Sequence, residues 1–258
     1  MLRSKQFAVY FIIAVAITMF VAIESAFTAQ ELKVGLIIGG KDAAVNEPDT
    51  LKKAGLEFDV IGKNDYKLEK LLEFDVIGVG VQGYDNNADL KANFKVVNQY
   101  VEAGGYLVTL DFQQDSTWDK NFLLHPLVLL DPDLEDNVGV TLADHDIFKI
   151  PNKITEDHFG AGVWGNGDFM ADGPQEANAP WVALVTDKQN KWPMVVGAPA
   201  GKGYVVLNSL QILQSIHRLG KGEVIEVLEN FLFWRGPMAV EPGSKMTTIW
   251  AKVKLARF

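Results

Sequence analysis

Two nearly continuous apolar segments, residues 75–81 (DVIGVGV) and 106–112 (YLVTLDF), constrain the fold of this chain most strongly. Such segments are typical of strands in a parallel sheet that helices cover on both faces. Between them, residues 89–103 repeat apolar side chains at the spacing of one helix face. A strand, a helix and a second strand in this order predict a right-handed crossover connection.

The same alternation of strand and helix extends to both sides of this unit. We therefore expect an α/β domain over residues 30–238, with a three-layer, open, mostly parallel sheet of the flavodoxin-like type. Further strands are expected at residues 32–38, 58–61, 181–186, 194–197 and 204–209, and further helices at 49–54, 66–72 and 223–234. Residues 123–136 predict a loop or short strand, and residues 159–180 predict a long loop. Within the tail 239–258, residues 245–255 alternate in a way that suggests an added edge strand.

The first 29 residues are typical of a secretory signal. Arg3 and Lys5 precede an apolar run at residues 7–23, and small residues such as Ala26 and Ala29 follow it. An uncleaved anchor is the alternative, because this run lies at the lower limit of the roughly 17–25 residues that span a bilayer. We expect an exported protein, periplasmic or secreted, that touches the membrane only through this segment if it stays uncleaved.

Composition excludes several classes of function. The chain has no cysteine, so a disulfide, a thiolate nucleophile and a cysteine-ligated metal are all impossible. The formal net charge is −9, and the sequence has no cluster of lysine and arginine that could bind the phosphate backbone of a nucleic acid. We expect no nucleic-acid partner.

The short motifs in the chain do not predict a cofactor or a metal. Gly39-Gly40 follows the first expected strand but lacks the G-x-G-x-x-G spacing of a dinucleotide site. The glycine-rich residues 197–203 are too short for a phosphate-binding loop and precede a strand. The acidic residues between 131 and 136 lack the pattern of an EF-hand loop. His145 and His158, each beside an aspartate, would form a metal or acid–base site only if the fold brings them together.

Polar side chains at the ends of two expected strands predict a binding site. In open parallel sheets, ligands bind beyond the carboxyl ends of the strands. The predicted ligand-binding residues are Gln82, Tyr84, Asp111, Gln113 and His145. An exposed tryptophan is a further candidate as a stacking platform for a sugar, and Trp164, within the glycine-rich loop, is the one we expect to be exposed.

Several segments resemble class I glutamine amidotransferase-like domains. They are FDVIGVG, GGYLVTLDF, the segment HDIF followed by PNKITEDHF, PMVVGAPAGKGYVVLNSLQI and VLENFLFW. The resemblance covers nearly all of residues 32–235 and includes the trehalose-utilisation (ThuA-like) group and domains fused to exported sugar deacetylases. It implies the same α/β fold and a possible role in carbohydrate biology.

The chain departs from that family at the positions that carry catalysis. Amidotransferases use a cysteine nucleophile on a sharp turn, and the matching turn near residues 112–113 has none. Ser116 lacks the G-x-S-x-G turn, and His217 is not followed closely by a glutamate. Where the family has proline after its histidine, this chain has Asp146. No catalytic residue is carried over.

These observations favour an exported, non-catalytic amidotransferase-like domain that binds a glycan or a partner protein, or serves as a scaffold. The alternative is a ThuA-like enzyme of carbohydrate metabolism that uses carboxylates and histidines such as Asp111, His145 and His158, or a metal that they hold. A structural protein of the cell envelope is a third hypothesis.

Overall fold

The computed structural model describes residues 32–39, 45–110, 118–130, 134–135, 139–164, 168–170 and 173–234. The expected signal or anchor and the expected edge strand of the tail lie outside these residues. So do Asp111 and Gln113, two of the predicted ligand-binding residues.

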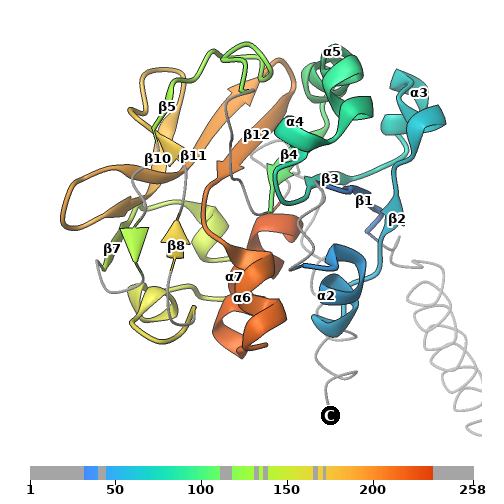
Figure 1. The fold of residues 1–258 in the computed structure, drawn as a ribbon. Helices are drawn as coiled ribbons and strands as arrows, with labels where there is room; N and C mark the ends of the chain where they lie inside the picture. The colour runs from blue at the N-terminus through green and yellow to red at the C-terminus, as the bar shows by residue number, and fades with distance from the viewer. Residues whose placement is uncertain are drawn as a thin grey trace, which may run out of the picture. The chain divides into compact units, whose positions relative to one another are not determined.

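One half of the main sheet is parallel, as the apolar segments predict (Figure 1). Neighbouring parallel pairs join β2–β1, β1–β3, β3–β4 and β4–β12. Their bounds are β1 Val34–Ile37, β2 Asp59–Val60, β3 Val76–Val79, β4 Tyr106–Thr109 and β12 Gly203–Asn208. Strands β1, β3, β4 and β12 are buried along their whole length, whereas β2 is an exposed edge strand.

The other half of the main sheet is antiparallel. Its order continues from β12 to β11, β10 and β7, with bounds β11 Pro193–Ala200, β10 Val182–Asp187 and β7 Val140–Leu142. Two small two-stranded sheets pair β5 (Leu129–Leu130) with β9 (Gly173–Pro174), and β6 (Leu134–Glu135) with β8 (Asp168–Met170). Four of the seven pairs in the described main sheet are parallel, so the predicted α/β class with a mostly parallel sheet is confirmed.

Helices cover both faces of the sheet and complete three layers (Figure 1). One face carries α3 (Leu68–Leu71), α4 (Gly83–Asn86) and α5 (Ala88–Glu102), and the other carries α2 (Glu47–Lys53), α6 (Ile212–Arg218) and α7 (Gly222–Phe233). Short 3-10 turns are η1 (Lys63–Asp65), η2 (Asp146–Phe148) and η3 (Glu156–Phe159). The last two pack on α7.

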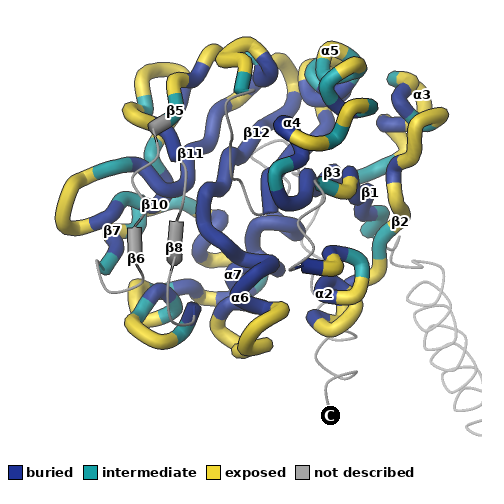
Figure 2. Tube along the Cα trace, viewed as in Figure 1, coloured by how far each residue is buried: buried dark blue, intermediate teal, exposed yellow. Residues whose placement is uncertain are grey.

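The core lies between the sheet and its helices, where Figure 2 shows the central strands as buried. On one face, Val97 and Tyr100 of α5 pack against Leu107 of β4. On the other, α7 is buried over most of its length, and Tyr106 of β4 donates a hydrogen bond of 2.6 Å to the carbonyl oxygen of Phe231. Apolar burial of this kind stabilises by about 25 cal/mol per Å² removed from water.

Several elements differ from their predicted bounds. Helix α2 begins at Glu47 rather than at residue 49, because Asn46 caps it and Pro48 occupies its first turn. Helices α4 and α6 and strand β7 were not expected. Residues 159–180 contain β8 and β9 instead of a continuous loop.

Trp164 is buried, which corrects the expectation that it is exposed. Only 2% of its surface is accessible. Its ring stacks on Phe159 at 5.7 Å, and its indole N–H donates to the carbonyl oxygen of His158 at 2.8 Å. Within the described residues, no helix combines the length and apolar character that crossing a membrane requires.

Candidate functional site

The order of the strands reverses between β1 and β3, where the chain runs to β2 on one side and to β3 and β4 on the other. In open α/β sheets, ligands bind outside the carboxyl ends of the strands at such a reversal. The loops that follow β1 and β3 therefore form the candidate site.

A buried carboxylate, that of Glu47, joins these two loops. The backbone N–H of Gly39, after β1, donates to its Oε2 at 2.9 Å, and the N–H of Val81, after β3, donates to its Oε1 at 2.6 Å. Glu47 is 3% exposed. Hydrogen bonds from N–H groups to an ionised acceptor are roughly twice as strong as neutral ones. The chain thus places its own carboxyl group where the fold usually receives a ligand.

Two glycines make this close approach possible. A Cβ atom at Gly39 would lie 1.8 Å from the carbonyl oxygen of Val81, and one at Gly80 would lie 2.3 Å from Oε1 of Glu47. No larger residue fits at either position without displacing backbone or carboxylate. Gly39 therefore serves close packing, and Gly80 leaves room for Glu47.

Gln82 and Tyr84 follow the carboxyl end of β3, as predicted, but they lie in different surroundings. Gln82 has a left-handed backbone (φ 53°) and accepts a hydrogen bond from Asn86 at 2.9 Å. The Tyr84 ring is 1% exposed and packs on Phe122 and Trp118, with ring centroids 5.6 and 5.7 Å away. Burial raises the pKa of the Tyr84 phenol. Tyr84 is part of the aromatic core, and Gln82 is the half-exposed residue of the two.

A buried polar cluster lies at the carboxyl ends of the neighbouring strands β4 and β12. Thr109 and Asn208 exchange two hydrogen bonds of 2.9 and 2.7 Å, and Asn208 also donates to the carbonyl oxygens of Leu110 and Leu210. Ser209 Oγ and Gln211 Oε1, just beyond β12, are buried without a hydrogen-bond partner among the described residues. Among the described residues, the carboxyl ends of β4 and β12 therefore carry hydroxyl and amide groups rather than a histidine.

His145 lies near the amino ends of β4 and β12, opposite to the carboxyl ends of the strands. Its ring contacts Trp234 and Tyr204, with centroids 4.7 and 6.3 Å away. Tyr204 pairs with Tyr106, the first residue of β4, so both belong to the amino ends of their strands. The structure therefore does not bring His145 together with Gln82.

The environment of His145 favours its neutral form. Burial is the main cause and lowers the pKa of the imidazole. Asp146 opposes this effect, and Lys149 adds to it. The Nδ1 atom accepts a hydrogen bond of 3.2 Å from the N–H of Ile147, so His145 acts as the cap of η2.

His158 is also separated from His145. Its Nε2 lies 3.1 Å from Glu226 near the start of α7, whereas His145 packs on Trp234 at the end of that helix. Glu226 and Trp234 are eight positions apart, which corresponds to about 12 Å of helix. Among the described residues no three histidines or carboxylates gather to hold a metal. The expected alternative of a joint site at His145 and His158 thus has no geometric basis here.

The PNKIT segment is fixed to α7 by buried amides. Asn230 Oδ1 accepts from the N–H of Asn152 at 2.9 Å, and Asn230 Nδ2 donates to the carbonyl oxygens of Ile147 and Asn152 at 2.7 and 2.9 Å. Asn152 Nδ2 donates to Glu229 at 2.9 Å. Residues that carry part of the family resemblance therefore have a packing role in this chain.

The sequence contained a signal for Glu47 that the predicted elements did not use. Asn46, Glu47 and Pro48 are together typical of a helix start, and this start follows the first strand and its glycine turn. Placing the helix start at residue 49 leaves Glu47 in the preceding loop, away from the strand ends. Its two backbone partners are 8 and 34 residues away in the chain.

Comparisons with known proteins identify the fold. No family model matches the chain, and no curated protein matches it. The cytoplasmic protein STM3548 from Salmonella typhimurium matches with a TM-score of 0.50 at 14% identity, over 79% of this chain and 99% of that one. The cytoplasmic protein STM1381 from Salmonella typhimurium LT2 matches with a TM-score of 0.53 at 13% identity, over 79% and 99%.

A solved structure described as a putative GMP synthase protein from Thermoplasma acidophilum matches with a TM-score of 0.49 at 12% identity, over 88% of this chain and 98% of that one. At such identities a likeness concerns the fold alone. The two matches with TM-scores of 0.50 and 0.53 support the α/β fold.

Proposed function

We propose that this chain is an exported, non-catalytic amidotransferase-like domain that acts as a binding or scaffolding module toward a glycan or a partner protein. The observation that carries the proposal is the position of Glu47. Its carboxylate accepts the backbone N–H groups of Gly39 and Val81 at the strand reversal. Backbone donors at such a place would otherwise stabilise a negatively charged ligand or intermediate.

The residue types at the neighbouring strand ends support the same proposal. The chain has no cysteine, so thiolate attack is impossible. At the carboxyl end of β12 the described chain places Asn208 and Ser209, neither of which is a general base at neutral pH. His145 lies at the amino ends of β4 and β12, and His158 pairs with Glu226 of α7. Export is supported by the basic start and apolar run of residues 1–29.

Three measurements on the full chain, expressed with a C-terminal tag, test the proposal. Cell fractionation should recover the chain outside the cytoplasm. Ammonia release from glutamine should equal that of a blank. A glycan array and capture of partners from the envelope fraction should identify at least one saturable ligand.

Opposite results would refute separate parts of the proposal. Ammonia release above the blank contradicts the non-catalytic role, and retention in the cytoplasm contradicts export. An array and a capture experiment that both remain empty contradict a binding module.

A further inference from the structure

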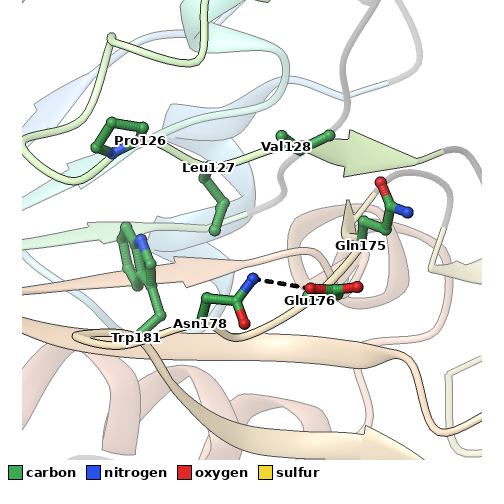
Figure 3. A pocket seen from close by; sticks show the side chains of 7 residues that line it. All are labelled: Pro126, Leu127, Val128, Gln175, Glu176, Asn178 and Trp181. Atoms are coloured by element: carbon green, nitrogen blue, oxygen red, sulfur yellow. Dashed lines mark hydrogen bonds between the residues drawn. The ribbon is translucent and has the colours of Figure 1, made fainter.

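A small pocket lies away from the strand reversal, between two segments that precede and follow the small β5–β9 sheet (Figure 3). Its volume is about 180 Å³. The N–H of Gln175 donates to the carbonyl oxygen of Val128 at 2.9 Å and holds the two segments together. The residues that line it are Pro126, Leu127, Val128, Gln175, Glu176, Asn178 and Trp181.

The polar side chains of this pocket fit a ligand rich in hydroxyl groups. Gln175 and Asn178 each carry an amide that both donates and accepts, as a hydroxyl does. Asn178 Nδ2 donates to Glu176 Oε2 at 2.8 Å, which fixes the carboxylate (Figure 3). Its second oxygen makes no hydrogen bond within the described part of the chain and is available as an acceptor. No lysine or arginine lines the pocket, so an anionic ligand is disfavoured.

The floor of the pocket is aromatic and held in place. Trp181 is 4% exposed and meets the His125 ring edge-on at 6.1 Å. His125 is fixed in turn, because its Nε2 lies 2.8 Å from the carbonyl oxygen of Pro199. The indole Nε1 of Trp181 is buried and has no hydrogen-bond partner among the described residues. An unpaired buried donor is destabilising, so a small movement of the ring that exposes it to a ligand acceptor would be favourable.

The size of the pocket limits the ligand. Pockets for drug-sized molecules usually measure about 300–1,000 Å³, and 180 Å³ holds a single small ring. Val128, which is 58% exposed, adds apolar surface at the rim for the hydrophobic side of such a ring. A preformed pocket of this kind reduces the cost of ordering on binding.

We propose that this pocket, with Trp181 as its floor and Gln175, Glu176 and Asn178 at its rim, binds one neutral pyranose ring of a saccharide. The inference rests on the proposed function, since it names the ligand class and the place for a glycan-binding module. A cationic amine is the competing occupant, because one carboxylate and one indole also suit an ammonium group.

The test combines a glycan array with titration calorimetry on the chain recovered from expressing cells. Glu176→Gln and Asn178→Leu alter exposed rim residues, so the variants should keep the fold. We expect each to weaken binding of the array-selected sugar at least ten-fold. Glu57→Gln, an exposed carboxylate elsewhere, should bind as wild type does. The indole N–H signal of Trp181, assigned with Trp181→Phe, should shift when the sugar is added to the ¹⁵N-labelled protein.

Each result has a separate meaning. Rim variants that bind a selected sugar as tightly as wild type overturn the pocket while the binding module stands. An array on which wild type binds no sugar also overturns the pocket, and envelope capture then decides the module by itself. Displacement of the sugar by n-butylammonium, with affinity falling steeply as salt is added, assigns the pocket to a cation and overturns the inference. Ammonia release from glutamine refutes the non-catalytic role whatever the pocket binds.

Discussion

Replacing Glu47 by glutamine tests the role of the buried carboxylate with almost no change of shape. The amide oxygen still accepts one backbone N–H, from Gly39 or from Val81. The other N–H then faces an amide NH₂, which is also a donor, and loses its partner. The wild-type bonds measure 2.9 and 2.6 Å and lie at a residue that is 3% exposed, so water does not replace the lost acceptor.

The expected loss of stability follows from these two bonds. A hydrogen bond to a charged group contributes about 1.5–3 kcal/mol, and an unpaired buried donor costs about 1–3 kcal/mol. Removing a buried charge also relieves its desolvation, which offsets part of the loss. We expect Glu47→Gln to lower the free energy of unfolding by about 2–4 kcal/mol.

Urea unfolding followed by far-ultraviolet circular dichroism measures this change. With a slope of about 2 kcal/mol/M, the midpoint should fall by about 1–2 M. Glu69→Gln changes the same side chain in the first turn of an exposed helix and should stay within about 0.5 kcal/mol of wild type. A Glu47→Gln midpoint that coincides with that of Glu69→Gln would refute the argument that the carboxylate joins the two loops.

Three further predictions follow from the same structure. Gly80→Ala places a Cβ 2.3 Å from Glu47 Oε1, so we expect the free energy of unfolding in urea to fall by about 2–4 kcal/mol. Combined with Glu47→Gln, the total loss should be smaller than the sum of the two single losses, and a total equal to that sum would contradict the contact. Asn230→Ala removes three buried hydrogen bonds and should cost about 2–4 kcal/mol in the same assay, against less than about 0.5 kcal/mol for exposed Asn64→Ala. Because burial lowers the pKa of His145, wild type should lose stability as pH falls from 7.5 to below the ordinary value of about 6.5. His145→Asn keeps a capping acceptor but cannot titrate, so its unfolding free energy should fall less over that range, and parallel pH curves would show that His145 is not the cause.

Most of the parallel half of the fold follows directly from the sequence, because all its strands except β2 are buried on both faces. Strands β3 and β4 appear as apolar segments, and α5 appears as an amphipathic helix. Helix α6 gives no such signal, because it has only seven residues and buries the polar Gln214 and Ser215 together with its apolar residues. Strand β7 has only three residues, with just one of them fully buried, so it lacks a period that a sequence pattern could reveal.

Exposure was harder to predict than fold class, as Trp164 illustrates. Glycine-rich segments usually run over the surface, which favoured an exposed tryptophan. Stacking on Phe159 and a hydrogen bond to His158 bury the ring instead. Both partners are within six residues of Trp164 in the sequence, but their orientation depends on η3 and its packing on α7.

The candidate site was only partly predictable, for a reason that concerns backbone rather than side chains. The rule that ligands bind at the carboxyl ends of parallel strands predicts a site at Gln82 and the loop after β3. It does not reveal that the N–H groups there already have an acceptor, because those donors belong to every residue type and carry no sequence signature. The sequence shows only that a glutamate, Glu47, stands at the start of α2. That its carboxylate accepts these two N–H groups depends on two loops that the fold brings together. In a fold whose ligands usually meet these backbone donors, a carboxylate supplied by the chain itself takes their place, and a ligand then has to bind at another surface, such as the pocket beside Trp181.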